Sequence, residues 1–198
     1  MPPDSTDTRR RLLEAAEAEF ARYGVAGARV DRIAEAAGAN KRLIYVYYGN
    51  KEQLFDTVLS TAVSKLIDAV PLDANDLPGY VAGMFDYLIE HPAMFRLTTW
   101  RSLERPDQTD ADLASYRRKV GALEKARDAG QLPEAFDPSD LLAIVVVLAK
   151  TWFLTSPALL GLSADDPWSA ERLARHRAAL VETVTRMLAP AESRDPAG

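Results

Sequence analysis

RVDRIAEAAGANKRLIYVYYGNKEQLF, residues 29–55, is the stretch of this sequence that decides the fold. Within it Ala34 is followed by Gly38 and then by Ile44. A helix-turn-helix needs this arrangement, because a small residue lets the second helix approach closely and glycine takes the left-handed turn conformation. The apolar residue after the turn holds the second helix in the core. The stretch therefore predicts two short helices on either side of Gly38.

Three tyrosines, Tyr45, Tyr47 and Tyr48, come directly after the basic pair Lys41 and Arg42. Tyr48 lies four positions after Ile44, so both share the inward face of the second helix. Lys41, Arg42, Tyr45 and Tyr47 therefore lie largely on other faces. Basic side chains and tyrosine hydroxyls donate to phosphate oxygens, and arginine also matches guanine N7 and O6. We expect this helix to lie in a DNA major groove. A group of tyrosines that only packs is the alternative.

The residues around this helix extend the expected interface. Asn40 stands at the helix N-terminus, which is itself an anion site, and Lys51 begins the next helix, where it can contact a phosphate. Leu43 either meets a thymine methyl group or packs. The run RRR at residues 9–11 is either a phosphate contact or a solvated helix end.

Helical periodicity continues through nearly the whole chain, and strand-like alternation is absent. The first helix is expected to stop at Gly24. Asn50 caps a long fourth helix, with Gln53 at its capping-box position. Near the C-terminus, one apolar helix is expected over 138–154 and a last helix after it. The pattern predicts an all-α protein of about nine helices.

Charge and composition limit the classes of function. The chain has 198 residues, 47% of them apolar, and a net charge of −5. Residues 1–55 hold nine Lys and Arg against eight Asp and Glu, and the rest holds fifteen against twenty-one. Only the N-terminal part therefore suits phosphate. The absence of cysteine, of a signal peptide and of a membrane span leads us to expect a cytoplasmic protein without membrane contact.

Signatures of catalysis are missing from the sequence. It has no Gly-rich phosphate loop, no nucleophile elbow, no His-Glu-x-x-His and no paired-carboxylate pattern. The two histidines, His91 and His176, are far apart in sequence and do not suggest a metal pair. We expect no enzyme, no catalytic residue, no metal site and no cofactor.

The stretch 29–55, with AEAEFARYG at 16–24 before it, resembles the DNA-binding region of the TetR family of bacterial transcriptional repressors. The resemblance covers about residues 8–56 and rests on Ile-Ala, Ala-Gly, a lysine, Ile-Tyr, an aromatic pair and Lys-Glu-x-Leu-Phe in the family's order. The family often has threonine where Arg29 stands, so a hydroxyl cap is missing there and Arg29 is expected to contact phosphate instead. The expected DNA-binding residues are Arg29, Asn40, Lys41, Arg42, Leu43, Tyr45, Tyr47 and Lys51.

The resemblance also implies a division of the chain. A DNA-binding domain is implied over 1–50, with the helix-turn-helix at about 29–48, and a helical ligand-binding and dimerisation domain over 51–198. The last two helices, about 138–155 and 167–188, would pair with their mates in a homodimer. The dimer would then present two recognition helices about one DNA turn (roughly 34–36 Å) apart on a palindromic operator.

Large side chains of the second domain are candidates for an effector pocket, since such pockets are mostly apolar. The candidates are Met84, Phe85, Tyr87, Phe95, Trp100, Tyr116, Trp152 and Phe153. Ordinary core packing is the alternative for each of them. If they line a pocket, the small-molecule effector is apolar or aromatic.

Taken with the resemblance, the sequence predicts a ligand-responsive regulator of transcription. The expected form is a repressor that binds double-stranded DNA as a dimer and is released by its effector. The alternative is a helix-turn-helix protein with no effector, whose C-terminal region only dimerises or meets a protein partner.

Overall fold

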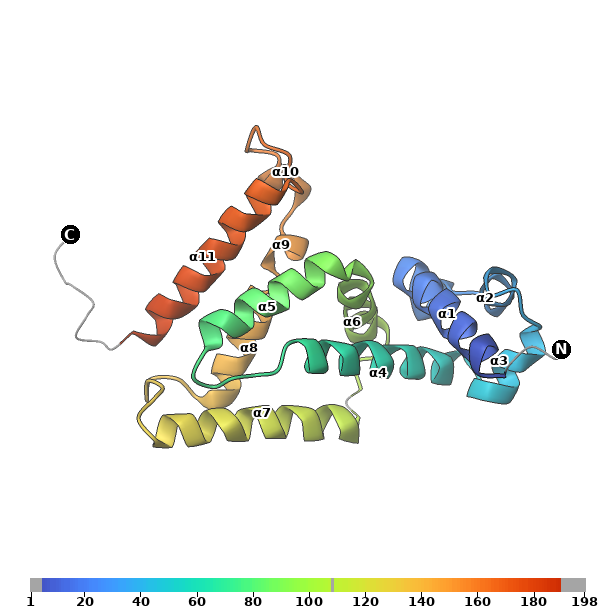
Figure 1. Ribbon diagram of the computed structural model, residues 1–198, viewed down its shortest axis with the longest axis horizontal. Coiled ribbons are helices and arrows are strands. Elements are labelled where there is room, and N and C mark those ends of the chain that lie inside the picture. Colours follow the sequence, from blue (N-terminus) through green and yellow to red (C-terminus); the bar gives the residue numbers. More distant parts are fainter. Residues whose placement is uncertain (1–4, 108, 190–198) are drawn as a thin grey trace. The chain divides into compact units, whose positions relative to one another are not determined.

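The computed structural model describes residues 5–107 and 109–189. Within these ranges the chain forms eleven α-helices and no strand, which confirms the all-α class (Figure 1). The helices are α1 (Ser5–Gly27), α2 (Val30–Ala36), α3 (Lys41–Tyr48), α4 (Lys51–Ala69), α5 (Leu77–Glu90), α6 (Pro92–Glu104), α7 (Asp110–Asp128), α8 (Pro138–Leu148), α9 (Thr151–Leu154), α10 (Pro157–Leu160) and α11 (Ala170–Leu188).

The chain divides into two compact units. The first consists of the described residues up to Asp68 together with His91–Asp107, and the second of Ala69–Glu90 together with the described residues after Asp107. Helix α6 thus belongs to the N-terminal unit although it follows α5 in the sequence. The domain boundary expected at residue 50 stays a prediction.

In the first unit, α6 and α2 pack against α1, and α3 packs against α2. The rings of Phe20 and Phe55 meet edge-on with their centroids 5.2 Å apart, and Leu12, Ile33 and Ile44 are fully buried in the same unit. Burial of a side chain of this size stabilises a fold by about 1.5–3 kcal/mol. These contacts hold α1, α2 and α3 together with α4 and α6.

Helix α1 bends sharply near its end, at the position where the sequence predicts a stop. Gly24 has φ 68° and ψ −175°, a backbone conformation that is essentially restricted to glycine. A short helical turn then continues to Gly27. The bend brings Gly24 close to α6, because a Cβ atom at Gly24 would lie 3.0 Å from the Trp100 ring and 2.5 Å from Glu104 Oε1.

In the second unit, α5 packs against α11 and α8, and α7 packs against α8 (Figure 1). The core of this unit contains the buried side chains Phe85, Leu88, Leu141, Val145 and Val184. None of the helices in the described ranges is long and apolar enough to cross a lipid bilayer.

The single apolar helix expected over 138–154 is two helices, α8 and α9. The Thr151 hydroxyl donates to the Leu148 carbonyl at 2.7 Å, and the Lys150 N–H donates to the Val147 carbonyl at 2.9 Å. The backbone bond is of the i→i−3 kind and marks the tightened turn at which α8 ends and α9 begins. The break and the four-residue α10 explain why the described chain has eleven helices instead of about nine.

We expect Gly24→Ala to destabilise the first unit by about 1–3 kcal/mol. The substitution places a side chain on a conformation that favours glycine and directs its Cβ into Trp100 and Glu104. Denaturant unfolding followed by circular dichroism measures the loss.

Gly130→Ala is the matched control. Gly130 also has a positive φ of 71°, but no described atom outside its neighbours lies within 4 Å of its Cβ position. A smaller loss is expected at Gly130. Equal losses would show that the approach of α6 to Gly24 contributes nothing to the cost.

Candidate nucleic-acid interface

The turn between α2 and α3 has the geometry expected from its sequence. Ala34 and Ile44 are buried, and Gly38 takes a left-handed backbone with φ 58°. The N–H groups of Gly38 and Ala39 donate back to the carbonyls of Glu35 and Ala34, each at 3.0 Å. This closes α2 in the way common for helices that end on a glycine. The structure therefore confirms a helix-turn-helix.

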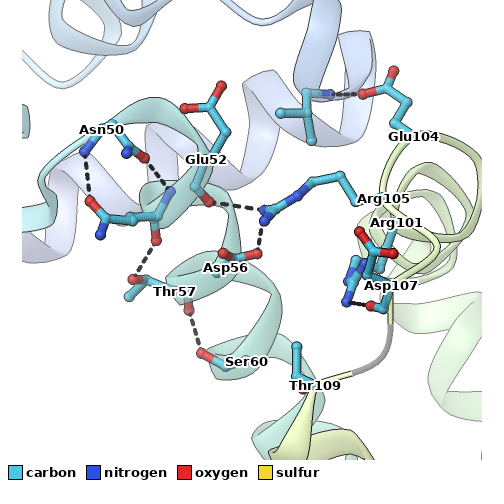
Figure 2. A network of polar contacts seen from close by, with 12 residues as sticks. Asn50, Glu52, Asp56, Thr57, Ser60, Arg101, Glu104, Arg105, Asp107 and Thr109 are labelled. Carbon is cyan, nitrogen blue, oxygen red and sulfur yellow. Dashed lines mark hydrogen bonds and ion pairs between the residues drawn. The ribbon is translucent and has the colours of Figure 1, made fainter.

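Side chains cap the helices on both sides of the next turn. Asn40 Oδ1 accepts from the N–H of Arg42 at 2.8 Å, so α3 has the predicted cap. Asn50 Oδ1 accepts from the Gln53 N–H at 2.8 Å, and Gln53 Oε1 accepts from the Asn50 N–H at 3.1 Å (Figure 2). This reciprocal pair is the predicted capping box of α4. The limits of α3 are thus set by local sequence.

One face of α3 is open to solvent. Lys41, Arg42, Tyr45 and Val46 are exposed, with 47% of Tyr45 and 64% of Val46 accessible. Leu43 is half-buried. The exposed face thus combines basic, hydroxyl and apolar groups, which are the groups that contact phosphates and base edges.

The other two tyrosines of α3 join it to α1. The Tyr48 hydroxyl donates to the backbone carbonyl of Arg9 at 3.1 Å, and burial raises the pKa of Tyr48, so the hydroxyl stays protonated. The Arg9 guanidinium lies over the Tyr47 ring, 4.5 Å from its centroid. Such a cation–π contact places the positive charge of Arg9 beside α3.

The three arginines at the start of α1 differ in their partners. Arg10 and Arg11 both pair with Asp7, at 2.6 and 3.1 Å, and Arg11 also donates to the Ala37 carbonyl at 2.6 Å. Arg9 forms no ion pair with any described residue. Of the run RRR, Arg9 is therefore the side chain best placed for a phosphate.

The two lysines expected at phosphates have partners within the protein. Lys41 Nζ lies 2.8 Å from an oxygen of Asp31, and Lys51 Nζ lies 3.4 and 3.3 Å from the carbonyls of Ala26 and Ala28. An ammonium group has three donors, so these contacts leave donors for DNA. The contacts also orient both lysines.

Glu19 supplies the cap that α2 lacks. Its Oε1 accepts from the Arg29 N–H at 2.8 Å and from Arg32 Nε at 2.8 Å, while the Arg29 side chain stays exposed. Burial by itself raises the pKa of Glu19, but the hydrogen bonds from Arg32 and Arg29 outweigh it and leave the pKa below its usual value. Glu19 is therefore a buried carboxylate that holds the start of α2.

Sequence reasoning missed two of these residues and did not single out a third. Val46 lies two positions after the buried Ile44, a spacing that puts it on the opposite face of the helix. Glu19 lies on the apolar stripe of α1, directly before Phe20, where an acid needs a partner. Arg9 was one of three equivalent arginines in the sequence, and only the contact with Tyr47 separates it from the others.

The eight residues expected around an effector fall on both units. The first unit contains Phe95 and Trp100, and the second contains Met84, Phe85, Tyr87, Tyr116, Trp152 and Phe153. Trp100 packs at the bend of α1 and donates its indole N–H to the Ala21 carbonyl at 3.4 Å. Tyr116 is 53% exposed.

Two of the candidates in the second unit meet at one histidine. The His176 ring lies 4.6 Å from Trp152 and 5.4 Å from Phe85, measured between centroids. Burial lowers the pKa of His176, and the charge of Arg172 lowers it further. Trp152 Nε1 is buried and has no hydrogen-bond acceptor among the described residues. We call Phe85, Trp152, Arg172 and His176 the Trp152 cluster.

Helix α3 is capped at its start, follows a glycine turn and buries one face. Its other face exposes basic, tyrosine and apolar groups. This is the arrangement of the DNA-reading element in helix-turn-helix proteins. The class of protein defined here is therefore a DNA-binding regulator.

Comparison with known proteins identifies the family. Residues 12–58 match the bacterial regulatory proteins of the tetR family, and residues 76–186 match a tetracyclin repressor-like C-terminal domain. The chain is 40% identical over 161 residues to the HTH-type transcriptional repressor SCO4008 of Streptomyces coelicolor, covering 79% of this chain and 83% of SCO4008. It is 32% identical over 141 residues to the repressor NicS of Pseudomonas putida, covering 65% and 66%.

A crystal structure of the transcriptional regulator SCO4942 of Streptomyces coelicolor aligns with a TM-score of 0.81 at 40% identity, over 91% of this chain and 97% of that chain. The chain belongs to the TetR family of bacterial transcriptional regulators.

Glu19→Gln is expected to lower the free energy of unfolding at pH 7 by about 1.5–3 kcal/mol, the range for hydrogen bonds to a charged group. Because the folded pKa of Glu19 is depressed, its contribution is present above the unfolded pKa of about 4.3 and is lost as the pH falls through the lower folded value. The difference between wild type and Glu19→Gln should therefore shrink below about pH 4. Urea unfolding at several pH values measures it; a difference that stays constant in acid would contradict the role of the charge.

Proposed function

We propose that the protein is a repressor that binds a palindromic operator as a homodimer and is released by a small apolar or aromatic effector. The observation that carries the proposal is the exposed face of α3, with Arg42, Tyr45 and Val46 beside the guanidinium of Arg9. The names of SCO4008 and NicS, both repressors, support the direction of regulation.

On this proposal the residues of the interface divide between bases and backbone. Arg42 reads guanine through N7 and O6, and Val46 meets a thymine methyl group, with half-buried Leu43 beside it. A second group of residues binds phosphates or holds α3 in place. This group consists of Arg9, Arg29, Asn40, Lys41, Tyr45, Tyr47 and Lys51.

Two exposed apolar residues support the homodimer. Ile144 and Val147 on α8 are 40% and 53% exposed, although α8 buries its opposite face in the second unit. A second copy of the same surface would cover them, and a two-fold axis there matches the symmetry of a palindrome. Because operator DNA lies in the bacterial cytoplasm, the proposal places the protein there.

The Trp152 cluster supports an effector. A buried indole N–H without an acceptor costs free energy, and a ligand that brings an acceptor oxygen would recover it. The effector would then combine an apolar body with at least one hydrogen-bond acceptor. Release from DNA requires that it bind the released state more tightly than the DNA-bound state.

A second candidate is a DNA-binding protein whose second unit only dimerises. It is favoured by the burial of Met84 and Phe85, which are 5% and 1% exposed and behave as ordinary core. Operator binding in the presence of aromatic carboxylic acids and esters separates the candidates, because only the first predicts release by one of them.

Selection from a random duplex pool with the purified protein is expected to recover a palindrome with half-sites about one helical turn apart. Binding to the recovered sequence should weaken steeply between 50 and 200 mM salt, by about 10³-fold or more if six phosphates or more are contacted. Recovery of a sequence without two-fold symmetry would contradict the dimeric reading. No enrichment, repeated after unfolding and refolding to remove a bound effector, would contradict operator binding itself.

Arg42→Ala is expected to cost about 1–3 kcal/mol of operator binding and to relax the preference for guanine at one position of each half-site. Arg9→Ala should instead weaken binding to all sequences and reduce the salt slope by about one. Fluorescence anisotropy on the selected palindrome and on its single-base variants measures both. Arg118→Ala, which removes the same charge from the exposed face of α7, is the matched control. A uniform loss for Arg42→Ala would show that Arg42 binds phosphate.

A further inference from the structure

Two consecutive residues at the end of α6 contact two different helices of the first unit. Glu104 is the last residue of α6, and Arg105 follows it directly. Figure 2 shows Glu104 directed at the backbone of α1 and Arg105 directed at α4. Neither residue lies on the exposed face of α3.

Glu104 binds the chain immediately after the bend at Gly24. Its Oε2 accepts from the N–H groups of Val25 and Ala26 at 2.8 and 2.9 Å. These groups begin the short helical turn after the bend, where a helix has no carbonyl partners of its own for its N–H groups. A carboxylate forms charge-assisted bonds there, which are stronger than those of a neutral acceptor.

Arg105 binds the first turns of α4. Its Nη1 lies 2.5 Å from Asp56 Oδ1 and 3.3 Å from the Glu52 carbonyl. Because Glu104 and Arg105 are adjacent in the chain, the end of α6 fixes α4 and the bend of α1 with respect to each other.

Val25, Ala26 and Gly27 form the last turn of α1 after the bend, and Ala28 follows it. These four residues, which we call the α1–α2 linker, are held from both sides. Their first two N–H groups bind Glu104 of α6, while the carbonyls of Ala26 and Ala28 accept from Lys51 of α4. The linker leads directly into the helix-turn-helix. Its position therefore determines where α2 begins, and α3 packs on α2.

We infer that Glu104 and Arg105 are positioning residues for DNA binding, which hold the α1–α2 linker and α4 in the arrangement that presents α3 to the major groove. The inference rests on the proposed function. It assigns a role in operator recognition to side chains outside the helix-turn-helix, acting through backbone groups of the linker.

Operator affinity of the full-length protein tests the inference, with the palindrome selected by the wild type and an unrelated duplex as probes. Glu104→Ala should weaken binding to the palindrome by about 5- to 150-fold, the range of a typical coupling between two sites of a protein. Binding to the unrelated duplex should change by less than about twofold, because sequence-independent binding rests on charge and not on the register of α3 with the bases. Glu104→Gln, which keeps an acceptor oxygen, should lose less than Glu104→Ala.

Glu90→Ala is the matched control, because Glu90 is an exposed glutamate at the end of α5. It should leave both affinities unchanged. Equal losses on the two duplexes for Glu104→Ala, or no loss on the palindrome, would overturn the inference.

Amide hydrogen exchange without DNA separates this inference from the proposed function. Glu104→Ala should speed exchange at Val25 and Ala26 while exchange in α11 stays as in the wild type. Unchanged exchange at the two residues would overturn the inference even if a palindrome is selected. If the wild type selects no palindrome, the proposed function fails, and exchange at Val25 and Ala26 still decides whether Glu104 holds the linker.

Arg105 is tested by a double-mutant cycle with Asp56. Arg105→Ala and Asp56→Ala should each weaken palindrome binding, and the double variant should lose no more than the larger single loss, because both remove one contact. Additive losses would show that Arg105 acts through another group.

Discussion

A left-handed backbone at Gly38 lets α3 fold back on α2, and the exposed face of α3 depends on that turn. The turn leaves the Ala37 carbonyl at the end of α2, and the Arg11 guanidinium of α1 binds it at 2.6 Å. With the turn tied to α1, Ile44 is buried and the residues on the other side of α3 face solvent. A side chain at residue 38 would strain the turn that holds α3 in this position.

The acidic residues of the first unit explain how a protein of net charge −5 can present a basic surface. Asp7 pairs with Arg10 within α1. Glu19 pairs with Arg32 and Asp31 pairs with Lys41, and these two pairs join α1 to α2 and α2 to α3. Arg42 and Arg9 are not neutralised in this way by any described residue, so their charges face outward. Local placement, and not the net charge, decides whether phosphate can approach.

The parts of the fold that the sequence predicted are those that depend on neighbouring residues. The cap at Asn40 and the reciprocal bonds of Asn50 and Gln53 each need only a few adjacent positions, and both are present. At Gly24 the sequence predicted the end of the first helix, and the structure has a bend there, after which α1 continues to Gly27. The apolar run 138–154, which periodicity predicted as one helix, is divided into α8 and α9 at a tightened turn around Lys150.

Contacts between distant residues could not be predicted in this way. Tyr48 reaches the carbonyl of Arg9 across 39 positions, and Glu104 reaches Val25 across 79. No pattern in a single sequence pairs such residues, because helical spacing says which face is apolar but not which helix covers it. The same limit explains why α6, expected in the C-terminal domain, packs on α1.

Side-chain size alone does not separate a ligand contact from a core residue, and the two buried or half-buried tryptophans show why. Trp100 packs beside Gly24 and its indole N–H has the Ala21 carbonyl as acceptor, so a structural role accounts for both its ring and its polar group. Trp152 has neighbours for its ring in His176 and Arg172, but no described residue accepts from its N–H. For apolar packing alone, a phenylalanine at residue 152 would serve as well as the tryptophan, and phenylalanine has no N–H donor to satisfy. A buried polar group without a partner therefore distinguishes a candidate ligand contact from a core residue, and this distinction becomes visible only when the hydrogen bonds of the folded chain are known.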